Sequence, residues 1–359
     1  MPEYPGTKGE RRVSVDVLDA AVREIFDRCG MSAEDAALLA TTLVAADLRG
    51  VHSHGVLRVP DYVSKLRRGG VDPRGRPRVV KEGAGALLVD GGNSMGQIGA
   101  SFAMRRAIER ARHTAVAAAA VRGSNHCGAM AFYAMLALPE AMIGLATTNA
   151  MPTMAPWGGA DRILGINPLA VAIPSGEELP IVFDAAFSHS ARGKIQVYEQ
   201  KGVSIPEGWA FDADGRPTTD PSAALDGLLQ PIGGYKGTGL ALVFGILSAV
   251  LAGASYGPEL GTLMEGPKPG EDGHFFLALD VTAFEDPARF TRRVDEIIRQ
   301  IRQSRRAAGV ARIYLPGELE AETERRYRQE GIPLNDLTLA GIGSAAAELG
   351  VVGPTLAPP

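Results

Sequence analysis

The first eighty residues space their apolar side chains in the way that is typical of amphipathic helices. The stretches SVDVLDAAVREIFDRCG and SAEDAALLATTLVAADLRG repeat apolar residues every three or four positions, which predicts two helices. Ser32 stands where an N-cap is expected, and Gly50 stands where a helix would end. A third helix is predicted over DYVSKLRRGG, with Pro60 in its first turn. Residues 51–58 should therefore form a loop between helices.

From about Ala84 onward, short apolar runs alternate with helical patterns, as in GALLVD, SFAMRRAIERARHT, AVAAAAVRGSNH and AMAFYAMLAL. This alternation favours an α/β layer with a parallel or mixed sheet. Near the C-terminus HFFLALDV predicts a strand, and a following helix carries one apolar stripe: Phe290, Val294, Ile297, Ile298 and Ile301. We therefore expect a helical domain formed by both termini, residues 1–80 and 285–359, around an inserted α/β domain, residues 81–284.

Residues 239–255, GLALVFGILSAVLAGAS, form an uncharged apolar stretch. At ~1.5 Å per residue, a helix of this length reaches only the short end of a membrane span. The stretch is a single segment, contains glycine and serine, and follows the loop GGYKGT. We expect a buried helix in a protein that has no membrane partner.

Composition and charge indicate what kind of protein this is and which partners it is not expected to bind. The 359 residues are 45% hydrophobic and 22% charged, which is typical of an ordinary soluble globular chain. A net charge of -4 and a pI near 5.9 argue against a surface that neutralises phosphates, so no nucleic-acid partner is expected. The two cysteines, Cys29 and Cys127, and the polar start MPEYPGTKGERRV favour a reducing cytoplasm.

The loop VHSHGVLRVP concentrates side chains that can do chemistry. Histidine exchanges a proton near neutrality and a neighbouring hydroxyl can orient it, so His54 with Ser53 is a candidate proton donor. Arg58 carries a planar fork suited to a carboxylate. A solvated or simply hydrogen-bonded loop histidine would account for the same pattern. Ser53 lacks the glycine two positions earlier that marks a hydrolase nucleophile.

A metal pair at His52 and His54 is a separate hypothesis, which would make the protein a metal-dependent hydrolase. Such a site needs at least a third ligand, and the chain contains neither a zincin motif nor a cysteine ligand cluster. We therefore predict no metal.

Two glycine-containing loops offer further sites. The loop GGYKG, residues 233–237, precedes the apolar helix and would present N–H groups, a helix N-terminus and Lys236 to an anion; a flexible turn explains it equally well. The loop SNHCG, residues 124–128, lies between a predicted strand and helix, where α/β sheets bind ligands, or simply caps the helix. Neither G-x-G-x-x-G after a strand nor a P-loop is present, so a bound nucleotide would need another fold.

The segments RGVHSHGVLRVPDYV, VRGSNHCGAMAFYA, TNAMPTMAPWGGADRILGINPLAVAIP, FDAAFSHSARGKI, IPEGWAFDADGRPTTDP and IGGYKGTGLAL together resemble the malate/L-lactate dehydrogenase family of NAD(P)-dependent oxidoreductases. The resemblance runs in one order from about Val13 to Val351. It implies a non-Rossmann NAD(P)-binding fold, a homodimer, and hydride transfer between nicotinamide and the carbon of a small 2-oxo or 2-hydroxy acid such as malate or lactate. Both NAD and NADP stay open as the cofactor.

The resemblance also implies roles for individual residues. His54 matches the proton donor, Ser53 its hydrogen-bonding neighbour, and Asp184 the carboxylate that orients the pair. His126 is either a second acid/base or a nicotinamide contact. Substrate binding is expected at Arg58, with Arg49 as competitor. The positions that match cofactor-binding residues are His126, Asp184, Ala185, Ala186, Phe187, Ser188, His189, Ser190, Tyr235, Lys236, Gly317, Glu318 and Leu319.

Two alternatives remain at this stage. Some members of the family reduce cyclic imino acids of the piperideine or pyrroline-2-carboxylate type. A homologue that binds ligand without catalysis is the other alternative; its support is the altered pocket residues Cys127, Ala185 and Phe187, while His54 and Asp184 are retained.

Overall fold

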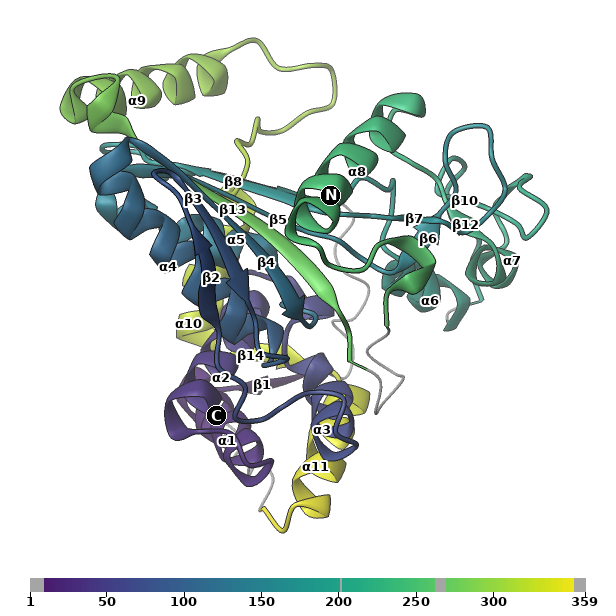
Figure 1. Ribbon diagram of the computed structural model, residues 1–359. Helices are drawn as coiled ribbons and strands as arrows, with labels where there is room; N and C mark the ends of the chain where they lie inside the picture. The colour runs from purple at the N-terminus through teal and green to yellow at the C-terminus, as the bar shows by residue number, and fades with distance from the viewer. Residues whose placement is uncertain (1–9, 201, 262–268, 352–359) are drawn as a thin grey trace.

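The computed structural model describes residues 10–200, 202–261 and 269–351 (Figure 1). The chain is a mixed α/β protein with three β-sheets of two, five and seven strands among these residues. The terminal helices lie at one end of the long sheet, and a smaller unit with short strands lies to its side.

The terminal unit is built mainly from helices that share one apolar core. It comprises α1 (Val15–Arg28), α2 (Ala33–Leu48), α3 (Val59–Arg67), α10 (Glu318–Glu330) and α11 (Asp336–Glu348). The strands β1 (Arg11–Val13) and β14 (Ile332–Leu334) pair antiparallel and join the two ends of the chain. As predicted, the Ser32 hydroxyl caps α2 by accepting from the Asp35 N–H at 3.2 Å, and Pro60 lies in the first turn of α3.

The sheet unit has seven strands in the order β2 (Arg78–Glu82), β3 (Ala86–Asp90), β4 (Val116–Ser124), β13 (Asp272–Asp280), β5 (Met142–Thr148), β8 (Leu169–Ile173) and β9 (Ile181–Ala185). Only β3 and β4 are parallel in this sheet; the other neighbouring pairs are antiparallel. Helix α4 (Gly96–Thr114) packs on β4 and β13, and the many alanines of β4 let it approach closely. Helix α5 (Met130–Met135) covers β5 and β8.

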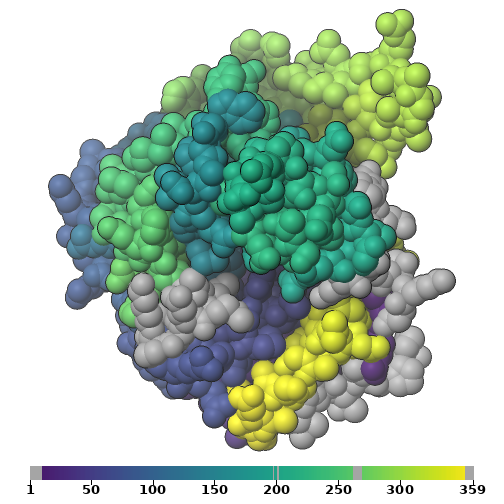
Figure 2. Space-filling view, turned by 90° about the vertical axis from the view of Figure 1, so that its right-hand side faces the viewer, coloured from purple at the N-terminus to yellow at the C-terminus, as the bar shows by residue number. Residues whose placement is uncertain are grey.

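The third unit corresponds to the glycine- and proline-rich middle of the sequence. Its sheet has the order β11 (Pro217–Thr218), β10 (Ala210–Phe211), β12 (Leu228–Leu229), β6 (Pro152–Met154) and β7 (Leu164–Gly165), with α6 (Arg192–Gln200) and α7 (Pro221–Asp226) alongside. Figure 2 shows this unit, in teal and green, above the yellow helix α11 and the blue-purple helices of the terminal unit.

Helix α9 (Pro287–Gln303) does not lie where the sequence placed it. We expected residues 285–359 to complete the terminal helical domain, but α9 lies at the opposite end of the long sheet (Figure 1). Its Val294 and Ile298 form a small core with Leu315 and with side chains of β8 and β9. The buried part of the predicted apolar stripe is narrower than expected, since Ile297 and Ile301 are 47% and 40% exposed.

Helix α8 (Tyr235–Ser248) also differs from its prediction. It was expected to be buried, yet its fully buried residues are the small ones, Gly237, Ala241, Gly245 and Ser248, and Phe244 is only partly buried against the core of the third unit. Most of the large apolar residues point outward: Val243 is 52% exposed, and Leu251 of the following turn η4 (Val250–Ala252) is 58% exposed. By length and apolarity alone, residues 235–252 could cross a membrane, although 33% of this stretch is buried against the protein.

Candidate active site

The imidazole rings of His54 and His126 lie face to face where the terminal unit meets the sheet unit. Their centroids are 5.6 Å apart and their planes differ by 16°. His54 ends the short 3-10 turn η1 (His52–His54), and His126 follows the carboxyl end of β4 in the loop that leads to α5. The structure therefore brings together the two loops that carried the predicted acid/base residues.

The buried carboxylate of Asp47 holds the backbone and a side chain of the His54 loop by hydrogen bonds. Asp47, 1% exposed near the end of α2, accepts the Val56 N–H at 2.7 Å and bonds His52 Nδ1 at 2.7 Å. A side chain at Gly55 would collide with this carboxylate, so the loop needs glycine there. His52 is thereby tied to Asp47, and its ring lies beside that of Tyr327 in α10, with centroids 6.0 Å apart.

Ser53 contacts the His54 ring, and Arg58 contacts the backbone of Ser53. The Ser53 hydroxyl and His54 Nδ1 share a hydrogen bond of 2.9 Å, as predicted for a neighbour of the proton donor. Arg58, in turn η2 (Val56–Arg58), donates from Nε to the Ser53 carbonyl at 2.8 Å and from Nη1 to Asp61 at 3.0 Å. Burial, reinforced by the positive charge of Arg58, lowers the pKa of His54 to about 4.

Asn125 and Tyr62 hold the His126 loop. The buried Asn125 amide donates to Asn93 Oδ1 and the Ser94 carbonyl, both at 2.9 Å, and accepts the Gly270 N–H at 3.0 Å. The Tyr62 hydroxyl lies 2.7 Å from His126 Nδ1. Burial first, and then the charge of His54 and of other basic neighbours, keeps the pKa of His126 well below its usual value. Both histidines are therefore neutral at pH 7 in this state.

Asp184 is placed differently from the role that the resemblance implied. Its carboxylate accepts the Ala131 N–H at 2.7 Å, and among the described residues no hydrogen bond joins it to Ser53 or His54. The residue is solvent-exposed, yet the protein atoms around its carboxyl partly desolvate it and raise its pKa to about 6, against the opposing effects of the Ala131 N–H and of Arg49. The carboxylate thus fixes the start of α5 and the adjoining His126 loop.

The two predicted substrate arginines differ in their surroundings. Arg49 is largely buried and lies 3.6 Å from Glu324 of α10. Its positive charge lowers the pKa of Asp184. Arg58 contributes positive charge to both histidines, and its side chain is 31% exposed. Of the two arginines, Arg58 is therefore the one whose charge lowers the pKa values of His54 and His126.

The predicted cofactor segments converge along β9 and the chain that follows it. Ser188 forms a bridge with Pro231, and the His189 N–H donates to the Gln230 carbonyl at 2.8 Å, so residues 187–190 lie beside the loop that leads into α8. Gly317, with φ of 91°, packs against Val182 in β9. Phe187 is buried and stacks on Phe244, so its ring belongs to the core of the third unit.

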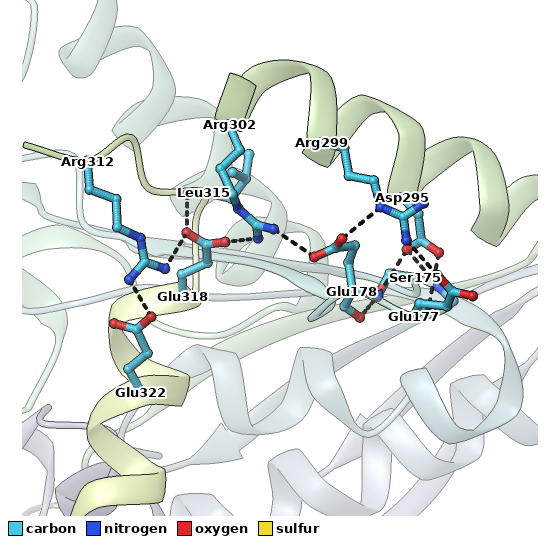
Figure 3. Close-up of polar contacts among 11 residues, drawn as sticks. Ser175, Glu177, Glu178, Asp295, Arg299, Arg302, Arg312, Leu315, Glu318 and Glu322 are labelled. Atoms are coloured by element: carbon cyan, nitrogen blue, oxygen red, sulfur yellow. Dashed lines mark hydrogen bonds and ion pairs between the residues drawn. The ribbon is translucent and has the colours of Figure 1, made fainter. Parts of the chain in front are cut away.

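Glu318 is committed to an ion-pair network (Figure 3). Its carboxylate, 4% exposed, pairs with Arg302 of α9 and accepts the Leu315 N–H at 3.0 Å. Arg302 also binds Glu178, in the turn between β8 and β9, at 2.8 Å. The carboxylate of Glu318 is thus occupied within the protein, which leaves the backbone of residues 317–319 and the partly exposed Leu319 to contact a ligand.

Three contributors to the site were not found from the sequence. Asp47 and Tyr62 lie within predicted helices, where their spacing fits ordinary helix faces, and Gln97 ends the loop GGNSMGQ that precedes a predicted helix. Their contacts reach other segments, as in the 64-residue separation between Tyr62 and His126. The only local signal was Asp47, an acidic residue at the end of the otherwise apolar run TTLVAADL.

No cluster of three or more His, Cys, Asp or Glu residues that could hold a metal occurs within residues 10–200, 202–261 and 269–351. His52 and His54, the pair considered for a metal, have separate partners in Asp47 and Ser53.

Comparison with known proteins shows the family to which the chain belongs. A family profile described as malate/L-lactate dehydrogenase matches residues 13–342. The chain belongs to this family. A malate dehydrogenase from Pyrococcus abyssi is 37% identical over 350 residues, which covers 95% of this chain and 96% of the relative. The solved sulfolactate dehydrogenase of Methanocaldococcus jannaschii superposes with a TM-score of 0.90 at 35% identity, covering 95% of this chain and 98% of the other.

Membership in the malate/L-lactate dehydrogenase family confirms the reaction class. The protein is an oxidoreductase of hydroxy and oxo acids that uses a nicotinamide cofactor. The family also spans imine chemistry: a Δ1-pyrroline-2-carboxylate/Δ1-piperideine-2-carboxylate reductase from Pseudomonas putida is 33% identical over 340 residues, covering 94% of this chain and 98% of the relative.

Proposed function

We propose that the protein catalyses reversible hydride transfer between NAD or NADP and a small 2-oxo or 2-hydroxy acid, of the size of malate or lactate, as a cytoplasmic homodimer. The observation that carries the proposal is the neutral pair His54 and His126 beside the guanidinium of Arg58. Such a site can exchange one proton with a substrate oxygen and attract one carboxylate.

His54 is the proposed proton exchanger. When hydride reaches a carbonyl carbon, negative charge develops on the oxygen, and protonation by imidazolium relieves it; oxidation needs the same histidine neutral as base. The lowered pKa of His54 favours the base form, whereas the bound substrate carboxylate would raise the pKa and favour the acid. Ser53 keeps the imidazole oriented through Nδ1 and leaves Nε2 for the substrate.

Arg58 is the proposed anchor for the substrate carboxylate. Nε and Nη1 are bound to protein oxygens, which fixes the plane of the guanidinium and leaves Nη2 as the donor for a ligand. A fixed arginine sets which carbon of the acid faces the nicotinamide. Arg49, which is paired with Glu324, is the competitor.

The cofactor would be held by the converging segments 184–190, 233–236 and 317–319. Tyr235 and Lys236 are exposed at the N-terminus of α8, where N–H groups and a lysine suit a phosphate. When bound, the nicotinamide supplies or accepts the hydride. We infer a non-Rossmann mode of binding, supported by the absence of G-x-G-x-x-G from the sequence and by a described long sheet with one parallel strand pair.

The homodimer is supported by the outer face of α8 and η4. Leu240, Val243, Ile246, Val250 and Leu251 are each at least 42% exposed. A contiguous row of this kind on a soluble protein marks an interaction surface, and a second copy of the chain could bury it. We propose this occupant in preference to a membrane.

Cyclic imino acid reduction is the second candidate function. A protonated imine carries its own positive charge and a neighbouring carboxylate, and the same Arg58 could bind that carboxylate. The 33% identity to the Pseudomonas putida reductase favours including this class of substrate.

A substrate and cofactor panel tests the proposed function. Purified protein is mixed with NADH or NADPH and with 2-oxo acids and cyclic imines in turn, while nicotinamide absorbance is followed. We expect oxidation of one cofactor with a 2-oxo acid. Preference for a cyclic imine would support the second candidate, and tight cofactor binding without turnover of any compound would support a non-catalytic homologue.

A further inference from the structure

Tyr62 and Gln97 form a buried polar pair behind His126 that the proposed function does not use. Tyr62 of α3 is 1% exposed and Gln97 of α4 is fully buried. The Gln97 amide donates from Nε2 to the Tyr62 hydroxyl at 3.0 Å, and this hydroxyl lies 2.7 Å from His126 Nδ1. The three side chains therefore form a chain of hydrogen bonds that ends at one ring nitrogen of the histidine.

The Tyr62 hydroxyl has one proton, so the orientation of the Gln97 amide sets the direction of the chain. Because Gln97 donates to Tyr62, the Tyr62 proton is free to be donated to His126 Nδ1. If His126 donated from Nδ1 instead, Tyr62 would accept twice, and its own buried proton would have no acceptor among the described contacts. Burial raises the pKa of Tyr62, so it stays a phenol and keeps that proton.

A neutral imidazole that accepts at Nδ1 carries its proton at Nε2. Burial, and then the basic side chains around His126, disfavour a second proton on the ring. These side chains come from four elements: His54 of η1, Arg58 of η2, Lys65 of α3 and His274 of β13. His54 is held differently, since the Ser53 hydroxyl can either donate to its Nδ1 or accept from it.

We propose that Tyr62 and Gln97 are positioning residues that hold His126 as the neutral Nε2–H tautomer, so that His126 gives the substrate oxygen a hydrogen bond while His54 exchanges the proton. A fixed neutral imidazole can polarise a carbonyl without transferring its proton. This division of roles rests on the proposed function, whereas the tautomer itself does not. The proposal assigns proton exchange to His54 and hydrogen-bond donation to His126, whereas the resemblance left open which of the two is the acid/base.

The tautomer is measured by NMR on full-length protein with isotope-labelled histidine, without substrate or cofactor. The signal of His126 is identified by its loss in His126→Gln. We expect the Nε2–H form at pH 7 in the wild type. Tyr62→Phe should give a mixture of tautomers, and Gln97→Met should do the same by freeing the Tyr62 hydroxyl to turn. The matched control is Tyr256→Phe, because the buried Tyr256 hydroxyl has no hydrogen-bond partner within the described residues.

Kinetics give the second readout. Loss of one hydrogen bond that orients His126 should lower kcat by roughly 5- to 10-fold in Tyr62→Phe with little change in KM, since one such bond is worth about 1 kcal/mol. Tyr256→Phe should retain wild-type kcat. If Tyr62→Phe fails to fold, Gln97→Met and the wild-type spectrum still decide the tautomer.

An Nδ1–H signal for His126 in the wild type would overturn the proposal, because the Gln97 amide would then have to face Tyr62 through Oε1. An unchanged tautomer in both variants would overturn it as well. A correct tautomer in an enzyme inactive on every acid and imine would leave the positioning role standing and count against the proposed function alone.

Discussion

His54 and His126 stack with their ring centroids 5.6 Å apart, although 72 residues separate them in the chain. Two imidazoles at this distance repel each other when both are charged, so the pair carries at most one positive charge, and the lowered pKa values keep both rings neutral near pH 7. Each also lies near the charge of Arg58. The site is therefore suited to handle a single proton per turnover.

Replacing His54 should stop proton exchange. We expect His54→Gln to lower kcat by a factor on the order of 10² or more while cofactor still binds, as measured by steady-state kinetics and nucleotide titration. His126→Gln should cost less, about 10-fold, because it removes a hydrogen bond to the oxygen. The control is His113→Gln, an exposed histidine on α4. A larger loss in His126→Gln than in His54→Gln would transfer the proton-exchange role to His126.

Arg58 should set the pH dependence of oxidation. Its positive charge contributes to the low pKa of His54, about 4, so Arg58→Gln should raise that pKa toward its ordinary value. Oxidation needs neutral His54, and activity is lost as pH falls through this pKa. The acid limb of kcat/KM in the hydroxy acid direction should therefore move to higher pH, together with at least a 10-fold rise in KM.

Arg49→Gln is the matched control for Arg58→Gln, because Arg49 pairs with Glu324 and does not contribute to the lowered pKa of His54. Its acid limb should stay where the wild type has it. A limb that moves only in Arg49→Gln would reverse the assignment of the two arginines.

The His54 loop should tolerate no side chain at position 55. Gly55→Ala places a Cβ against the buried carboxylate of Asp47, and we expect the free energy of unfolding to fall by about 1–3 kcal/mol. Gly343→Ala is the opposite case: it lies inside α11 with open space around it, and should be neutral or stabilise by up to about 1 kcal/mol. Urea denaturation of both variants measures the contrast. Equal stability of the two would show that the loop can move away from Asp47.

The exposed face of α8 should be buried in the assembled protein. Val243→Glu combined with Leu251→Glu places two charges on this face, and light scattering should report monomers where the wild type gives dimers. Leu337→Glu, at a residue that is 76% exposed on α11, should leave the dimer intact. A double variant that remains dimeric would place the interface elsewhere.

Much of the terminal unit could be predicted from local pattern. Ser32 and Pro60 begin helices where their backbone preferences suggest, and HSHG forms the expected turn between helices. The positions of α8 and α9 could not be predicted in this way. Apolar periodicity reports that a face is buried but not against which element, and α8 buries mainly its small residues while most of its large ones, Phe244 excepted, stay exposed.

The same limit applies to the site. His54 and Ser53 are neighbours in sequence, so their hydrogen bond follows from the loop itself. The link from Gln97 through Tyr62 to His126 depends on how α3, α4 and the loop after β4 pack together, which no local pattern encodes. The contact of Asp184 with Ala131, in place of the histidine pair, is a result of the same tertiary packing.

Hydride transfer itself is the central claim, and isotope transfer measures it most directly. The protein is incubated with a 2-oxo acid and with NADH or NADPH that carries deuterium at the transferable position of the nicotinamide, and the product is analysed by mass spectrometry. The account predicts one deuterium on carbon 2 of the hydroxy acid, with a sharply reduced yield in His54→Gln. A hydroxy acid formed without deuterium at that carbon would contradict it.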